Sequence, residues 1–174
     1  YRVVDDSGND VAPGQDGELL ISGNTLMVGY YEDEEQTAKA IVNGWLHTGD
    51  VVRVDENRYV KITDRKKDIY IMGGFNVAPA EVEQVLSKLD GVAQIAIVAA
   101  PDDKFGEVGA AFIIKAPNSS LTTDQVISYA REHLANYKVP RYVEFVDAFP
   151  MNAMGKVLKR DLKVMFEKKL SGTA

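Results

Sequence analysis

Apolar residues in the second half of the chain recur at helical spacing. Four of them follow Pro79 at positions i, i+3, i+4 and i+7, which predicts one apolar face of a helix that ends at Gly91. These four are Val82, Val85, Leu86 and Leu89. A second such pattern predicts a helix that Thr122 or Thr123 caps and that runs through Leu134. A third helix is expected over Lys159–Leu170.

Short apolar runs between these helices predict strands. The expected strands are Asp68–Met72, Val92–Ala99, Val108–Ile114 and Tyr142–Val146, and a loop over Pro101–Gly106 joins the second to the third. The order is strand, helix, strand, strand, helix, strand, helix. This order favours an α+β domain in which helices flank a small β-sheet.

The first part of the chain has shorter and weaker patterns. Strands are expected at Tyr1–Val4 and Glu18–Ser22, and a hairpin is expected from Val51–Val54 and Arg58–Thr63. Asp33 is a suitable cap for a short helix that ends at Ile41. These elements predict a short-stranded β-subdomain with little core of its own.

Charge changes sharply between the two parts. Residues 1–64 contain 5 Lys and Arg against 13 Asp and Glu, whereas residues 65–174 contain 15 against 13. The change falls at Asp64-Arg65-Lys66-Lys67, where three cations arrive together. A charge run is usually only a solvated face. Together with the change in element pattern, it predicts two domains, residues 1–64 and 65–174.

The composition of the chain argues against several classes of function. A net charge of −6 argues against nucleic-acid binding. The absence of cysteine excludes a disulfide framework and a thiol nucleophile, and it fits a cytoplasmic protein. His47 and His133 lie far apart, so no metal site is expected in this chain. No apolar run reaches the roughly 20 residues of a membrane span, so no integral membrane segment is predicted.

Three segments have residues that suit chemistry, although each has a common structural explanation. In Gly44–Asp50, an aspartate at a loop–strand junction could accept hydrogen bonds from a ribose diol, or simply cap a turn. In Asp64–Glu83, Gly73-Gly74 could let the backbone approach a ligand, or form a tight turn. In Pro150–Arg160, Gly155 frees a loop from which Lys156 extends toward a phosphate, or the loop is only surface. The phosphate-cradling P-loop pattern is absent.

The order and spacing of these segments carry more information than any one of them. Together with Gly17-Glu18-Leu19 and Gly29-Tyr30-Tyr31, they resemble the adenylate-forming superfamily of acyl-CoA synthetases, luciferases and peptide-synthetase adenylation domains. The resemblance covers nearly the whole chain. Gly73–Glu81 is most similar to bacterial fatty-acyl and aryl-acid CoA ligases, because peptide-synthetase domains typically have a basic residue where Asn76 stands.

The resemblance implies an overall reaction and a place for this chain in it. Such enzymes join a carboxylic acid to ATP, release pyrophosphate, and transfer the acyl group from the adenylate to CoA. The chain would be the end of the large N-terminal adenylation domain followed by the mobile C-terminal domain. The phosphate loop, the adenine motif, the Mg²⁺-binding acid and the acyl pocket would then lie upstream of Tyr1. We therefore expect the chain alone to be inactive.

The resemblance also implies roles for individual residues. Asp50 and Arg65 would bind the ribose hydroxyls of ATP, and Lys67 would be the hinge residue within residues 64–67. Lys156 would stabilise the charge that builds as the carboxylate attacks the α-phosphate. The tunnel for the pantetheine thiol of CoA would be lined by Gly73, Gly74 and Phe75, with Asn76 contacting nucleotide or CoA. Glu81 would have a structural role at a helix start.

Two further classes of function remain open on the residues alone. The chain could be an independent module that binds CoA or a carrier protein, or an interaction domain with degenerate motifs. The retained Asp50, Arg65, Gly74 and Lys156 argue against the degenerate domain. Met154 departs from the small or hydroxylated residue usual before the Gly-Lys pair. Fatty, steroid-derived and aryl acids are all compatible as substrates, and the oligomeric state is open.

Overall fold

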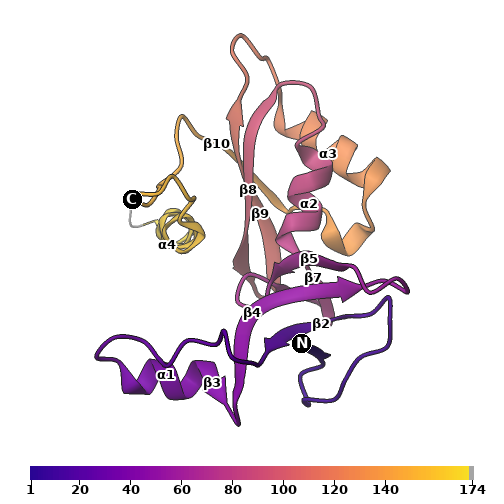
Figure 1. Ribbon diagram of the computed structural model, residues 1–174. Helices are drawn as coiled ribbons and strands as arrows, with labels where there is room; N and C mark the ends of the chain where they lie inside the picture. Colours follow the sequence, from indigo (N-terminus) through magenta and orange to yellow (C-terminus); the bar gives the residue numbers. More distant parts are fainter. Residues whose placement is uncertain (173–174) are drawn as a thin grey trace. The chain divides into compact units, whose positions relative to one another are not determined.

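The chain divides into two compact units, and a computed structural model describes residues 1–172 (Figure 1). The first unit is Tyr1–Lys67, and the second begins at Asp68. The predicted hinge segment, residues 64–67, therefore ends where the first unit ends. Its role as a hinge stays a prediction.

The first unit is an antiparallel sheet of five short strands. These are β1 (Arg2–Val4), β2 (Asp16–Ile21), β3 (Ile41–Val42), β4 (Trp45–Val54) and β5 (Val60–Arg65), with α1 (Glu34–Ala40) before β3. Strand β2 pairs with one edge of β4, and β3 and β5 pair with successive stretches of its other edge. Strand β4 begins at Trp45 rather than at the predicted Val51, because residues 45–47 pair with β2 and β3.

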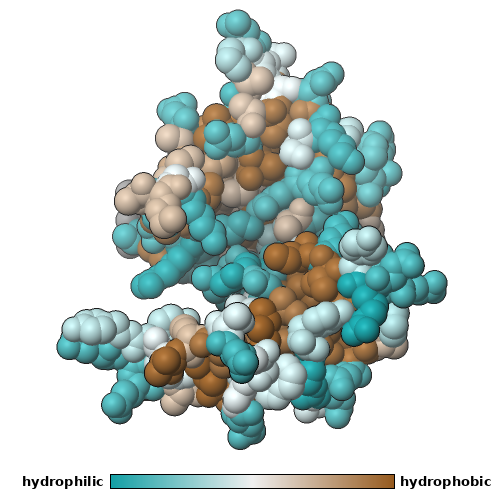
Figure 2. All heavy atoms as spheres, in the orientation of Figure 1, coloured by the Kyte–Doolittle hydropathy of each residue, from teal (hydrophilic) through white to brown (hydrophobic). Residues whose placement is uncertain are grey.

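The core of this unit is small, as the sequence predicted. It is formed by five buried side chains, Val3, Val4, Leu20, Val51 and Val52. Helix α1 contributes no buried residue, and its start is fixed by the Asp33 carboxylate, which accepts the Gln36 N–H at 2.8 Å. Large apolar side chains such as Val28, Val42 and Ile62 are instead exposed. Figure 2 shows apolar residues gathered at the surface of the part that contains β2 and β4.

The second unit is a mixed sheet with helices on both faces. Its strands are β6 (Tyr70–Met72), β7 (Phe75–Val77), β8 (Val92–Asp102), β9 (Gly106–Lys115) and β10 (Tyr142–Phe145). Its helices are α2 (Pro79–Leu86), α3 (Thr123–His133), the short 3₁₀ turn η1 (Asn136–Lys138) and α4 (Lys159–Leu170). Strand β10 runs parallel to β9, and the other pairs are antiparallel.

Burial along β9 shows that both faces of this sheet are covered. Successive side chains of a strand point to opposite faces, yet every residue from Val108 to Ile113 is buried. Helices α2 and α3 lie on one side of the sheet and α4 on the other (Figure 1). The predicted α+β architecture is thereby confirmed, and Thr122 is the cap of α3, with a full capping box.

Three local predictions for the second unit were wrong. Helix α2 ends at Leu86, and residues up to Gly91 form turns, although the apolar spacing continues to Leu89. Strand β7 was not predicted, because three residues are too few for a periodic pattern. The expected loop at 101–106 is shorter than predicted: residues 103–105 form the turn, whereas Pro101 pairs with Glu107 and Asp102 with Gly106.

Candidate functional site

Asp50 and Arg65 face each other across two strands of the first unit. Asp50 on β4 is the direct ladder partner of Arg65 on β5, and Arg65 Nη1 donates to Asp50 Oδ1 at 2.6 Å. The Asp50 side chain keeps 22% of its surface exposed, so the carboxylate can accept further hydrogen bonds. The two residues that the sequence assigned to one ligand are thus brought together 15 positions apart.

Asp50 is presented by a bulge within β4 rather than at a loop–strand junction. Glu18 of β2 pairs with Val51 and Leu20 pairs with His47, so Leu19 alone lies opposite the three residues 48–50. Gly49 has a φ of 70°, a left-handed conformation that favours glycine. We call residues 48–50 the Thr-Gly-Asp bulge.

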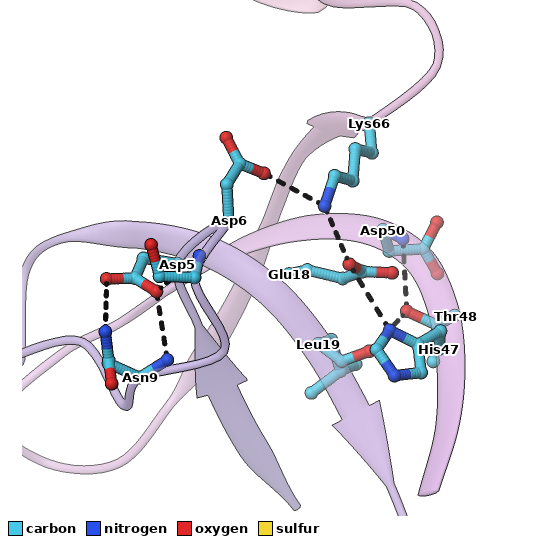
Figure 3. A network of polar contacts seen from close by, with 10 residues as sticks. Asp5, Asp6, Asn9, Glu18, Leu19, His47, Thr48, Asp50 and Lys66 are labelled. Atoms are coloured by element: carbon cyan, nitrogen blue, oxygen red, sulfur yellow. Dashed lines mark hydrogen bonds and ion pairs between the residues drawn. The ribbon is translucent and has the colours of Figure 1, made fainter. Parts of the chain in front are cut away.

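Thr48 holds this bulge in place with its hydroxyl. Thr48 Oγ1 donates to the Leu19 carbonyl at 2.8 Å and accepts the Asp50 N–H at 3.0 Å (Figure 3). One side chain therefore joins the bulge to the neighbouring strand and also fixes the backbone of Asp50. Each residue of the Thr-Gly-Asp motif has a separate physical reason to be there.

A polar network beside the bulge was not predicted. Lys66 Nζ lies 3.0 Å from Glu18 Oε2 and 3.0 Å from Asp6 Oδ1, and His47 Nδ1 lies 3.5 Å from the same Glu18 oxygen (Figure 3). Hydrogen bonds to Asp6 and Glu18 raise the pKa of Lys66 above its ordinary value. The sequence contained a signal for the burial of Glu18, because alternate residues of a strand share a face and Glu18 therefore lies on the same face as the apolar Leu20.

Lys67, the predicted hinge residue, is the last residue of the first unit. The residue before it is held firmly, since the Lys66 N–H donates to the Gly49 carbonyl at 2.8 Å. Lys67 itself lies in a turn between β5 and β6. The boundary between the two units therefore lies one residue beyond Lys66, whose backbone is hydrogen-bonded to the Thr-Gly-Asp bulge.

In the second unit, Gly73 and Gly74 form the two-residue turn of the β6–β7 hairpin. Their φ angles are 56° and 90°, as a type I′ turn requires, and Met72 pairs with Phe75 across it. The Gly73 N–H donates to the Phe105 carbonyl at 2.9 Å, which ties this turn to the β8–β9 hairpin. Asn76 follows on β7 with an exposed side chain.

Phe75 is an exposed aromatic residue with an unpredicted partner. Its ring stacks on Tyr137 with centroids 4.7 Å apart, although 57% of Phe75 is exposed. Close to the same turn, the Arg141 guanidinium lies 5.2 Å from the centre of the Phe105 ring. An aromatic ring can stack on a nucleobase, and a cation beside it can neutralise the charge of a phosphate. Tyr137 and Arg141 lie far along the sequence from Gly73, so local patterns could not reveal this surface.

Lys156 lies in a closed loop rather than a freely moving one. The Asn152 side chain accepts the N–H groups of Met154 and Lys156 at 3.0 and 2.9 Å, and the Asn152 N–H donates to the Lys156 carbonyl. Gly155 supplies a positive φ of 75°. The expectation that Gly155 frees the loop was therefore wrong: it permits a tight turn. The Lys156 side chain is exposed, as predicted.

Residues 1–172 contain no group of three or more His, Cys, Asp or Glu arranged to hold a metal ion. Within the same residues, none of the helices has both the length and the apolar character that crossing a membrane requires.

Comparison with known proteins gives consistent matches. Residues 81–156 match the family described as AMP-binding enzyme C-terminal domain. A 3-[(3aS,4S,7aS)-7a-methyl-1,5-dioxo-octahydro-1H-inden-4-yl]propanoyl:CoA ligase of Rhodococcus jostii is 52% identical, over 90% of this chain and 30% of the relative. A long-chain-fatty-acid–CoA ligase of Salmonella typhimurium is 43% identical, over 93% of this chain and 29% of the relative.

A solved structure agrees with these relatives. ATP-bound MatB from Rhodopseudomonas palustris matches 97% of this chain and 34% of its own length, with a TM-score of 0.91 and 34% identity. The chain spans about 30% of the length of the curated relatives described above.

Proposed function

Because the chain belongs to the adenylate-forming, AMP-binding enzymes, we propose that it is the C-terminal part of an ATP-dependent acyl-CoA ligase. The whole enzyme would convert a carboxylic acid, ATP and CoA into acyl-CoA, AMP and pyrophosphate through an acyl-adenylate. The observation that carries this proposal is the Asp50–Arg65 pair on the Thr-Gly-Asp bulge. In this pair the accessible carboxylate of Asp50 lies beside the guanidinium of Arg65, an arrangement that could bind the two hydroxyls of a ribose.

The ribose role follows from the donors and acceptors at this pair. Two vicinal hydroxyls offer two donors, and a carboxylate can accept both. Arg65 already occupies one side of Asp50 Oδ1, so it holds the carboxylate in a fixed orientation and offers further N–H donors to the ribose oxygens. The bulge leaves Asp50 without a ladder partner in β2, while Asp50 keeps its pairing with Arg65 in β5.

Lys156 would assist the adenylation step. As the acid carboxylate attacks the α-phosphate, negative charge is shared between the attacking oxygen and the phosphate oxygens, and a nearby ammonium lowers the barrier. The loop around Asn152 limits where Lys156 can reach, because both backbone ends of the turn are hydrogen-bonded. Such an ordered loop would bring the Lys156 ammonium to one defined position beside the α-phosphate.

The thiol-transfer step would use the other exposed turn of the second unit. Gly73 and Gly74 lack side chains, so a pantetheine arm could pass close to the backbone, and Phe75 and Asn76 would line its path. The Phe75–Tyr137 stack would hold one wall of this path. A pivot at Lys67 would allow the second unit to present Lys156 in one half-reaction and Gly73–Asn76 in the other.

The remaining partners follow from the same proposal. The exposed apolar surface of the first unit supports contact with an N-terminal adenylation domain of the same protein. We expect Mg²⁺ to bind through that N-terminal domain. We expect a fatty acid or related acid as substrate, with an aryl acid as the alternative, a cytoplasmic location, and no activity from this chain alone.

The proposal is tested by separating the two half-reactions in the complete enzyme. Lys156→Ala should lower acyl-adenylate formation by a factor on the order of 10²–10³, while thiol transfer from preformed adenylate is largely kept. Lys88→Ala removes an exposed lysine from the turn that follows α2 and serves as the control. Equal loss of both half-reactions in Lys156→Ala would reject the assigned role.

A second candidate function is a stand-alone module that binds CoA or a carrier protein. The exposed Phe75–Tyr137 stack favours it, because this surface lies entirely within the second unit. Calorimetric titration of the 174-residue chain with CoA separates the two candidates. Tight binding by the chain alone would support the module, whereas weak binding by the chain and tight binding by the complete enzyme would support the ligase.

A further inference from the structure

Glu18 is a buried carboxylate for which the ligase reaction gives no role. It belongs to the Gly17-Glu18-Leu19 motif in β2, and its side chain is only 10% exposed. Gly17 fits there because an added Cβ would lie 2.7 Å from the Val4 carbonyl oxygen. Burying a carboxylate is costly unless it is paired. The residues that pair with Glu18 therefore indicate why it is there.

Glu18 lies beside the bulge that presents Asp50. In the β2–β4 ladder, Glu18 marks one end of the bulge through its pairing with Val51, and Leu20 marks the other end through His47. Glu18 Oε2 also lies 3.5 Å from His47 Nδ1, so the carboxylate contacts the residue that precedes the bulge. Figure 3 shows Glu18 and His47 close to Thr48 and Asp50.

The same carboxylate oxygen holds the residue that follows Arg65. Lys66 Nζ lies 3.0 Å from Glu18 Oε2, and the Lys66 N–H donates to the carbonyl of Gly49, directly before Asp50. The second partner of Lys66, Asp6, is 89% exposed and so provides a weaker anchor. Glu18 is thus a buried group that contacts both Lys66 and His47.

From these contacts we propose that Glu18 is a positioning residue for the nucleotide site. It fixes both backbone segments that support the Asp50–Arg65 pair, and so keeps that pair in the geometry that the ribose hydroxyls require. The inference rests on the proposed function, because it needs Asp50 to bind ribose. Glu18 would act through Asp50 and Arg65 and would not touch the nucleotide.

The test must separate positioning from a general loss of stability. We would measure kcat/KM of acyl-adenylate formation in the complete enzyme with ATP and with 2′,3′-dideoxyATP, which lacks the diol. A variant that loosens only the Asp50–Arg65 pair lowers the preference for ATP, because the dideoxy analogue never used that pair. A variant that merely reduces the amount of folded enzyme lowers both values by the same factor.

Glu18→Gln is expected to lower the preference for ATP over the dideoxy analogue by about two- to tenfold, which corresponds to the net free energy of one ordinary hydrogen bond. Lys66→Met should act in the same direction, and Lys66→Arg should largely restore the preference because it can still reach Glu18. Asp16→Asn is the matched control. It lies on the same strand, and its exposed pair with Arg53 is unconnected with the bulge.

Each outcome decides something. An unchanged preference in Glu18→Gln, or equal loss for both nucleotides, overturns the positioning role. If Glu18→Gln fails to fold, as circular dichroism would show, the Lys66→Met and Lys66→Arg pair decides in its place. Asp50→Ala is the reference: if it keeps the full preference for ATP, the proposed ribose site is wrong, and the positioning role falls with it. Loss of preference in Asp50→Ala alone overturns only the role of Glu18.

Discussion

Glu83 and Lys159 form an ion pair, with Lys159 Nζ 2.6 Å from Glu83 Oε1. Glu83 lies in α2, which follows the Gly73-Gly74 hairpin, and Lys159 is the first residue of α4, which follows the Lys156 loop. The pair therefore joins the two helices that follow the exposed turns of the second unit. The same Glu83 oxygen accepts the Ile97 N–H of β8 at 2.7 Å.

Replacing Glu83 should destabilise the second unit in a graded way. Glu83→Ala leaves the Ile97 N–H without its acceptor and should cost about 1–3 kcal/mol of unfolding free energy. Glu83→Gln keeps an acceptor and should cost less, and Lys159→Met should also cost less because the Ile97 N–H still has its Glu83 acceptor. Urea unfolding of the three variants measures this order. Equal losses in Glu83→Ala and Glu83→Gln would contradict it.

Tyr70 offers a substitution that should not destabilise the protein. It is 1% exposed, and its hydroxyl has no hydrogen-bond partner among residues 1–172. Tyr70→Phe removes this unmet polar group and should change the unfolding free energy by between zero and about +1 kcal/mol. A thermal melt at neutral pH measures the change. A large loss of stability would show that the hydroxyl makes a contact after all.

The same residue predicts a dependence on alkaline pH. Burial, with a smaller effect from the nearby Glu107 charge, raises the pKa of Tyr70 above its ordinary value of 10.0. A raised pKa means that the unfolded chain ionises first, so this part of the stability is present below pH 10 and is lost above it. Tyr70→Phe should therefore lose less stability than wild type between pH 9 and about pH 11. Parallel curves in melts across this range would contradict the prediction.

Gly49 and Gly44 provide a matched pair of backbone tests. Both have positive φ, 70° and 78°, and an added Cβ would meet nothing within 4 Å at either position. Each change to alanine should therefore cost roughly 1–2 kcal/mol from backbone strain alone. Only Gly49→Ala should also raise the KM for ATP, since Gly49 supports Asp50 and Gly44 lies in the β3–β4 turn. An equal rise in both variants would argue against the bulge as the nucleotide site.

Gly17 should be intolerant of any side chain for a different reason. A Cβ at Gly17 would lie 2.7 Å from the Val4 carbonyl oxygen and 2.8 Å from Val3 Cγ1, so the strands β1 and β2 would have to separate. Gly17→Ala should cost about 1–3 kcal/mol of unfolding free energy. Gly8→Ala is the control, because that position is strained by its φ of 82° but has open space around it. Calorimetric melts should show the larger loss at Gly17 if steric overlap dominates.

The sequence predicted elements well where a local pattern was long and complete. The spacing of apolar residues, Thr122 as a cap and the final helix over Lys159–Leu170 all appear in the structure. Prediction failed at the end of α2, because the apolar spacing continues to Leu89 although the helix ends at Leu86. It also failed at β7, because a strand of three residues is too short to give a periodic pattern. The residues after Leu86 form turns closed by local hydrogen bonds, and β7 is only long enough to pair with β6 across the Gly73-Gly74 turn.

Residue types and their order determined which family this chain resembles, because each motif keeps the charge or the missing side chain that its chemistry needs. Only the tertiary structure decided how those residues meet. Asp50 faces Arg65 because of the register in which β4 pairs with β5, and Phe75 stacks on Tyr137 because α3 and η1 return to the β6–β7 turn. The contact between the buried Glu18 and Lys66 likewise joins residues 48 positions apart. A single sequence shows which segments favour a helix or a strand. It does not show which strands pair, because pairing depends on contacts between residues that lie far apart in the sequence.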